Sequence, residues 1–256
     1  TTVPEIYRSD NLSRFLIMSF IKGEKPVLNE AYMLKLIKYI QKMQSCINNE
    51  GKKKLPYAAE SAFSIKEHFD KVIVKLITIK QRLKDLDSGF DLLEKIDFNI
   101  IPWINNYRLK LERLDDFNNR INLNQMILSQ SDIGIHNSFI YKNQLYTFDY
   151  EYAGLDDPSK TLCDIILHPD VSLNDERILK VLQKLKSHSI FKNCFNKGLK
   201  LLPLYRYKWF GIIINSYLKR INNKYENEDF LNKAKIYLLK TDTIINFILE
   251  DLDLKG

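Results

Sequence analysis

The segment LSQSDIGIHNSFIYKNQLYTFDYEYAGLDDPSKTLCD, residues 128 to 164, carries a polar set in a chain rich in Ile, Leu, Lys and Asn. Asp132 lies in an expected loop, Asn137 stands at the entry to an expected strand, and Asp149 stands at the exit of a second strand. Because a hairpin brings its open ends together, we expect these three side chains to converge. Mg²⁺ takes such oxygen ligands, typically one or two carboxylates plus substrate phosphates. The pattern therefore indicates a divalent-cation site.

The spacing of these residues also fits phosphoryl transfer. That reaction uses a carboxylate to orient the attacking hydroxyl, and an Asn and an Asp to hold the metal ions on the nucleotide phosphates. Asp132 and Asn137 have the D-x4-N spacing of the HRDLxxxN loop. Asp and Asn are also common turn residues, so each one alone could belong to an ordinary polar hairpin. Their order and spacing together favour a catalytic site.

The elements that must position this set are mostly helical. Hairpin strands are expected in SFIYK and LYTFD, joined by NQ, and two earlier strands at Pro4 to Arg8 and Arg14 to Ile21. Apolar residues recur at helical spacing, with Asn29 as an N-cap for the first helix. The helices are expected over residues 29–47, 59–86, 90–114, 159–167, 174–218 with a break at SIFKN, and 228–250. The fold class is α+β, mostly α.

The polar segment resembles the aminoglycoside phosphotransferase and choline kinase family, the small-molecule branch of the protein-kinase-like fold. That family has a catalytic loop HGDxxxxN and, one short hairpin later, a metal motif ID[FW]xxAG; here the matching segments are QSDIGIHN and FDYEYAG. The resemblance implies that Asp132 is the catalytic base and that Asn137 and Asp149 are catalytic metal ligands, with Glu151 assisting. It also implies that Asp164 braces the catalytic loop through backbone hydrogen bonds. Mg²⁺ and ATP are the implied cofactors, and a small-molecule hydroxyl is the implied acceptor.

The chain departs from the family at Gln130 and Ser131, where His and Gly are usual. Because that His is chiefly a structural brace, the departure concerns the support of the loop more than its chemistry.

The opening VPEIYRSDNLSRFLIMSFIKG is similar to the last strands and hinge of the nucleotide-binding lobe. The resemblance implies that adenine is held by the carbonyl of Ser19 and the amide of Ile21, with Met18 behind them and Phe20 in the same hinge. Residues 1–25 would then be a remnant of the small lobe, and residues 26–256 the helical lobe. The Gly-rich loop and phosphate-pairing Lys of the family should precede residue 1, so we expect a fragment.

Other features narrow the function. The longest apolar runs are too short for a membrane span, and a cytoplasmic location is expected. The net charge of +7 is spread along helix faces, so nucleic-acid binding ranks last. The cysteines are isolated, and His136 is expected to brace the loop or lie partly exposed, because no second His or Cys lies nearby. His168 is expected to end a helix.

Two questions stay open at this stage. The alternative to an enzyme is a catalytically silent kinase-like module that binds nucleotide or docks a partner. The acceptor is equally open among sugars, amino alcohols and aminoglycosides. The aromatic stretch 204–218 is expected to be core, with the lining of an acceptor pocket as its alternative.

Overall fold

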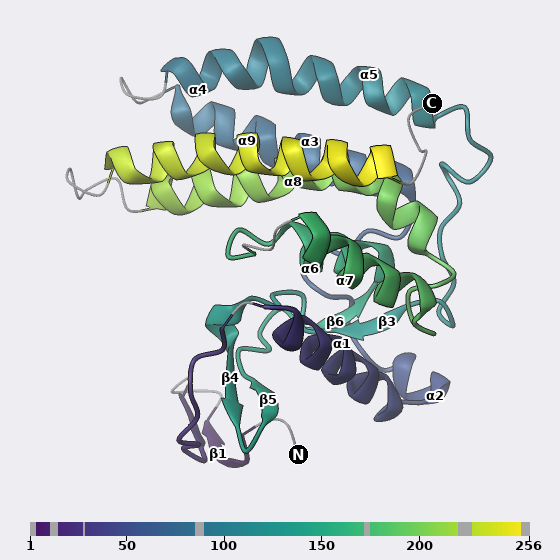
Figure 1. The fold of residues 1–256 in the computed structure, drawn as a ribbon, viewed down its shortest axis with the longest axis vertical. Coiled ribbons are helices and arrows are strands. Elements are labelled where there is room, and N and C mark those ends of the chain that lie inside the picture. Colours follow the sequence, from purple (N-terminus) through teal and green to yellow (C-terminus); the bar gives the residue numbers. More distant parts are fainter. Residues whose placement is uncertain are drawn as a thin grey trace.

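A computed structural model of the chain describes residues 4–10, 15–27, 29–84, 90–171, 175–219 and 227–251. The helices of residues 65–111 and 195–251 gather at one end, and the small strand pairs lie toward the other, together with the helix of residues 30–45 (Figure 1). The elements are β1 (Ile6–Asp10), β2 (Phe15–Met18), α1 (Glu30–Ser45), α2 (Asn49–Lys52), α3 (Ile65–Leu83), α4 (Phe90–Glu94), a π-helical segment (Lys95–Ile100), α5 (Ile101–Leu111), β3 (Ile127–Ser129), a 3-10 turn (Ile135–Asn137), β4 (Ser138–Tyr141), β5 (Gln144–Thr147), β6 (Gly154–Asp156), α6 (Pro158–Leu167), α7 (Asp175–Ser187), α8 (Phe195–Lys219) and α9 (Asn227–Asp251).

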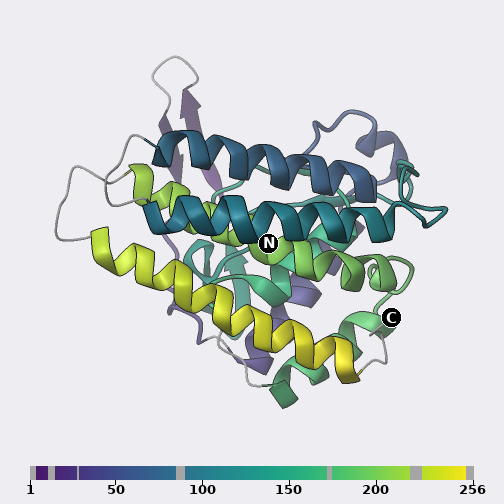
Figure 2. The ribbon, with the colours of Figure 1, turned by 90° about the horizontal axis from the view of Figure 1, so that it is seen from above.

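Helix α8 is the centre of the helical end. Helices α3, α6 and α9 all pack against it, and Figure 2 shows α3, α5, α8 and α9 running side by side. Most of α8 is buried, including Phe210 and Tyr217, which are fully covered. The aromatic stretch 204–218 is therefore largely core. No helix among the described residues is long and apolar enough to cross a bilayer.

Local sequence signals explain where the helices begin. Asn29 caps α1, as expected, by accepting a hydrogen bond from the backbone N of Tyr32 at 3.0 Å. Helix α3 begins at Ile65 instead of the expected residue 59, because Ser64 and Glu67 form a capping box. Ser64 Oγ accepts from the N of Glu67 at 3.2 Å, and Glu67 Oε2 accepts from the N of Phe63 at 3.0 Å.

The next helical pattern, 90–114, is one continuous run in three parts. A π-helical segment separates α4 from α5, and Pro102, which has no N–H to donate to the preceding turn, lies directly after this segment at the start of α5. The expected break within 174–218 is also present, between α7 and α8.

Within the described part of the chain, the strands form three antiparallel pairs. Hairpin β4–β5 is confirmed, but its turn is Lys142–Asn143, with φ of 48° and 59°, and the expected turn NQ was one residue late. Two consecutive left-handed residues match the twist of a hairpin. The pair β3–β6 was not expected. Strand β1 is shifted from the expected Pro4 to Arg8, β2 is shorter than the expected Arg14 to Ile21, and residues 11–14 between them lie outside the described part.

Candidate active site

Two strand pairs hold the polar loop at both ends. Strand β3 leads into the loop and pairs with β6, which follows the FDYEYAG segment, with Ser129 opposite Gly154. Just outside the paired residues of hairpin β4–β5, the O of Asn137 accepts a hydrogen bond from the N of Phe148 at 3.0 Å. The residue before Asp149 is therefore bonded to Asn137. At the open end of the hairpin, the backbone thus links the segment of Asn137 to the segment of Asp149.

Gln130 and Ser131 support the loop in place of the His and Gly of the resembling family. Gln130 is fully buried, and its Nε2 donates to the O of Phe148 at 2.5 Å and to the O of Asp149 at 3.3 Å. Ser131 adopts φ 68°, which is uncommon for a residue with a Cβ. Its Oγ donates to the O of Ala59 at 3.1 Å, which helps to hold that conformation.

Asp132 and Asn137 face each other across the loop. Asn137 is buried, and its Nδ2 donates to the O of Asp132 at 3.2 Å. Asp132 is half-buried, and its Oδ2 lies 3.2 Å from Nε2 of His136. Burial raises the pKa of Asp132, but the hydrogen bond and charge of His136 hold it below its usual range. The hydrogen bond to Asp132 in turn raises the pKa of His136. Asp132 is therefore an ionised carboxylate.

Asp149 and Glu151 stay exposed at the other side of the same space. Asp149 has φ 65°, and its charge contributes to the raised pKa of His136. The carboxylates of Glu151, Asp149 and Asp132 all contribute to the raised pKa of Tyr152, with the hydrogen bond to Glu151 as the largest cause. Asp132 and Asp149 thus act on the same two neighbours.

Asp164 does not bind the loop in the expected way. Its Oδ1 accepts from Nζ of Lys208 at 2.6 Å and from Nε1 of Trp209 at 3.0 Å, and Lys160 Nζ lies 3.4 Å from its Oδ2. Among the described residues, no backbone amide of loop 130–137 donates to it. Asp164 can support the loop only indirectly, through Lys160, whose Nζ lies 3.4 Å from Oγ of Ser131.

A second set of buried charges anchors the start of α6. Asp157 caps the helix by accepting from the N of Ser159 at 2.8 Å. Its Oδ2 also accepts from Lys197 and lies 3.3 Å from Nε2 of His68, whose Nδ1 lies 2.7 Å from Oη of Tyr205. Burial raises the pKa of Asp157, but these partners hold it at about 2.

His168 is the residue that the sequence did not connect with the site. It ends α6, as expected, but its ring stacks on that of His136 with 5.6 Å between centroids. His136 therefore does have a second His beside it in the folded protein, and the expectation that none lies nearby is wrong. Only the path of α6 relative to the loop could reveal this, because the two residues are far apart in the chain.

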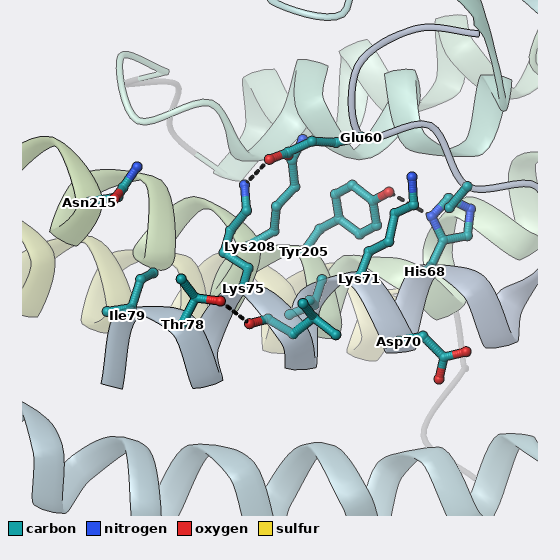
Figure 3. Close-up of a pocket in the computed structure, with 13 residues that line it drawn as sticks. Glu60, His68, Asp70, Lys71, Lys75, Thr78, Ile79, Tyr205, Lys208 and Asn215 are labelled. Carbon is teal, nitrogen blue, oxygen red and sulfur yellow. Dashed lines mark hydrogen bonds and ion pairs between the residues drawn. The ribbon is translucent and has the colours of Figure 1, made fainter. Parts of the chain in front are cut away.

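A cavity of about 600 Å³ lies between α3 and α8 (Figure 3). Its lining includes Lys71 and Lys75 of α3, Tyr205 and Lys208 of α8, and Glu60 from the loop before α3. Glu60 pairs with Lys75. The loop that carries Glu60 is the one that Ser131 contacts through Ala59. Tyr205 and Lys208 line the cavity, whereas Asp132, Asn137 and Asp149 do not, and its link to the catalytic loop is the contact between Ser131 and Ala59.

The expected hinge residues lie at the end of β2 and in the linker to α1. Phe20 is 90% exposed and Met18 is 41% exposed. The linker is fixed to the hairpin by two 2.8 Å hydrogen bonds between the backbones of Glu24 and Ile140. The hinge segment is thereby attached to the strand that follows Asn137.

Solved structures show the same fold. The chain is similar to choline kinase from Cryptosporidium parvum, with TM-score 0.61 and 12% identity over 99% of this chain and 76% of that one. For choline kinase from Streptococcus pneumoniae the TM-score is 0.56, with 15% identity over 94% and 75%. For AMP-bound spectinomycin phosphotransferase it is 0.57, with 13% identity over 92% and 72%.

No family model matches the sequence, and no curated protein matches it. At 12–15% identity the likeness concerns the fold, and it extends over nearly the whole chain. The chain has the protein-kinase-like fold of the choline kinases and the aminoglycoside phosphotransferases.

Proposed function

We propose that this protein transfers the γ-phosphoryl group of ATP, with Mg²⁺, to a hydroxyl group of a small molecule. The observation that carries the proposal is the joining of the two motifs by the Asn137–Phe148 and Gln130–Phe148 hydrogen bonds. These bonds hold Asp132, Asn137 and Asp149 at one end of the hairpin. The fold likeness to small-molecule kinases supports the same activity.

The donor set fits Mg²⁺. Asn137 uses its Nδ2 for the loop, which leaves its Oδ1 for a cation, and Asp149 and Glu151 offer exposed carboxylates. Hard cations prefer such oxygen ligands. These residues would hold the ion, which when bound neutralises charge on the nucleotide phosphates.

Asp132 acts on the acceptor. Its carboxylate orients the hydroxyl toward the γ-phosphorus and accepts the hydroxyl proton as the new O–P bond forms and the bond to the leaving ADP breaks. A pKa below the usual range keeps Asp132 ionised, so it is ready to accept a hydrogen bond from the hydroxyl. Positioning and charge neutralisation supply most of the acceleration in this chemistry.

The hinge supplies the adenine contacts in this proposal. The backbone N of Ser19 already donates to the O of Glu5 at 2.7 Å. The carbonyl of Ser19 and the amide of Ile21 remain for adenine, beside the partly exposed Met18 and the exposed Phe20. Residues 1–25 thus act as the nucleotide-binding part, and 26–256 as the lobe with the catalytic loop.

The cavity between α3 and α8 is the proposed acceptor pocket. It is lined by Lys71, Lys75 and Lys208 against the carboxylates of Glu60 and Asp70. Glu60 is committed to Lys75, and Asp70 to residues outside the lining. Lys75 pairs with Glu60 and Lys208 with Asp164, so a cationic acceptor would meet no unpaired carboxylate in this lining. Among sugars, amino alcohols and aminoglycosides, this favours a neutral or anionic sugar.

The test uses the full chain with Mg·ATP and a panel of sugars, amino alcohols and aminoglycosides. Thermal shift should show stabilisation, about 2.7 kcal/mol at a hundredfold excess over Kd. Asp132→Asn should keep this stabilisation and lose phosphate transfer, whereas Asp149→Ala should lose both. Stabilisation without transfer to any acceptor would refute the enzyme and support the silent module. Transfer that survives Asp132→Asn would refute the role of Asp132.

A further inference from the structure

Three side chains near the catalytic loop have the donor types of a transition-metal site. Asp132 and His136 come from the loop, and His168 comes from the end of α6. One potential ligand atom of each lies within 4.8 Å of the others. Mg²⁺ prefers oxygen ligands to imidazole, whereas Zn²⁺ and its neighbours in the first transition row bind imidazole together with carboxylate. The cluster therefore differs in kind from the oxygen set at Asn137 and Asp149.

The two imidazole rings have matching orientations. They stack with 27° between their planes. Nδ1 of His136 lies 3.9 Å from Oδ2 of Asp170, and Nδ1 of His168 lies 3.7 Å from the same oxygen. Nε2 of His136 lies 3.2 Å from Oδ2 of Asp132, and Nδ1 of His168 accepts a hydrogen bond from the backbone N of Asp170 at 3.2 Å. A metal-bound His commonly donates its second N–H to a carboxylate, and Asp170 is placed for that role with His136.

An unsatisfied atom points to a missing ligand. His168 is 8% exposed, and its Nε2 is buried without any hydrogen-bond partner. The ring is held edge-on against Trp209, with 4.7 Å between centroids. A buried polar nitrogen without a partner is rare, because its desolvation is uncompensated. A cation bound between Asp132 and the two rings would satisfy this nitrogen.

We propose that Asp132, His136 and His168 form a site for a single Zn²⁺-like ion, bound through one carboxylate oxygen and the two Nε2 atoms. Three protein ligands leave a fourth tetrahedral position for water, as in open zinc sites. Asp170 accepts a hydrogen bond from Nδ1 of His136 in the bound state. The site is separate from the Mg²⁺ ligands.

Occupation of this site has a consequence for catalysis, which rests on the proposed function. Asp132 cannot orient an acceptor hydroxyl while its carboxylate binds a transition metal. Zn²⁺ should therefore inhibit phosphate transfer at a fixed Mg·ATP concentration, and a chelator should restore the rate.

The experiment measures metal binding without nucleotide. The full chain carries Cys46→Ser, because Cys46 is an exposed thiol that could take the same metal. Co²⁺ is titrated while the visible absorption of tetrahedral Co²⁺ is followed, and Zn²⁺ is then added to displace it. His136→Gln is the test variant, because its side chain is about half exposed and the change should leave folding intact. His188→Gln is the matched control, since His188 lies outside the cluster, near Gln41.

The proposal predicts one Co²⁺ per chain with a tetrahedral spectrum, displaced by Zn²⁺. Affinity should fall at least 100-fold in His136→Gln, about 10–100-fold in Asp170→Asn, and not at all in His188→Gln. Absence of a tetrahedral spectrum, or equal affinity in His136→Gln, would overturn it. If phosphate transfer is found but no Co²⁺ binds, only this inference falls. If Co²⁺ binds and no transfer is found, only the proposed function falls.

Discussion

Lys160 gives the sharpest stability prediction. It is 1% exposed, and its Nζ lies 2.7 Å from Oδ2 of Asp156 and 3.4 Å from Oδ2 of Asp164. Burial lowers the pKa of Lys160, but the two carboxylates outweigh burial and raise it, so the side chain is charged. In Lys160→Met, Asp164 keeps Lys208, whereas Asp156 keeps only the backbone N of Asp157. A buried carboxylate is then left without a cation.

Removal of one partner of a buried pair costs about 3–5 kcal/mol. For a chain of this size that corresponds to a loss of about 6–20 °C in Tm. Urea unfolding followed by circular dichroism measures the change. Lys66→Met is the matched control, because Lys66 and Asp70 form an exposed pair, worth below about 1 kcal/mol. The double variant Lys160→Met/Asp156→Leu should be less destabilised than Lys160→Met alone. A loss below about 1 kcal/mol in Lys160→Met would refute the reasoning.

Three further predictions concern the frame of the site. Burial lowers the pKa of His68 from 6.5, so on acidification the unfolded chain binds a proton before the folded protein does, and the stability falls as the pH drops below 6.5. His68→Gln should make the urea midpoint less dependent on pH in this range. An unchanged dependence of the urea midpoint on pH would contradict this role of His68. Gln130→Ala should lower the free energy of unfolding by about 1–3 kcal/mol and reduce phosphate transfer, whereas Gln144→Ala, at an exposed position, should do neither. Equal effects of the two variants would contradict the role of Gln130 in supporting the loop. Gly154→Ala should destabilise by about 1–3 kcal/mol because a Cβ there would meet backbone atoms of residues 56–58 at 2.5–2.6 Å, whereas Gly211→Ala meets a flexible Ile79 side chain at 3.1 Å and should be near neutral.

The parts of the site that are local in sequence could be predicted. The order of Asp132, Asn137 and Asp149 around one hairpin follows from alternating strands and a turn within 18 residues. Hairpin pairing then brings their backbones together, because strand pairing is a short-range consequence of the sequence. The main helices follow equally well from their apolar spacing.

The predictions that failed concern long-range contacts. Asp164 accepts hydrogen bonds from Lys208 and Trp209, which lie 44 and 45 residues away in the chain. No feature of the segment 128–164 predicts these donors. His168 approaches His136 only because α6 packs against α8 and ends beside the loop. Such contacts depend on helix packing, which periodicity alone does not specify.

Some errors had a signal in the sequence. The Ser64 to Glu67 spacing is the capping-box pattern and marks the true start of α3. Strands β3 and β6, by contrast, have three residues each, which is too short for alternation to be recognised.

The most direct test of the phosphotransferase site is the binding of Mn²⁺, as a paramagnetic substitute for Mg²⁺, with a non-hydrolysable ATP analogue. Electron paramagnetic resonance counts free and bound Mn²⁺ in the full chain and in Asp149→Ala, with Asp115→Ala as an exposed control outside the two motifs. We predict analogue-dependent Mn²⁺ binding that Asp149→Ala weakens at least tenfold, about 1.4 kcal/mol, and that Asp115→Ala leaves unchanged. Equal Mn²⁺ binding by Asp149→Ala and the unaltered chain would contradict the assignment of the metal site.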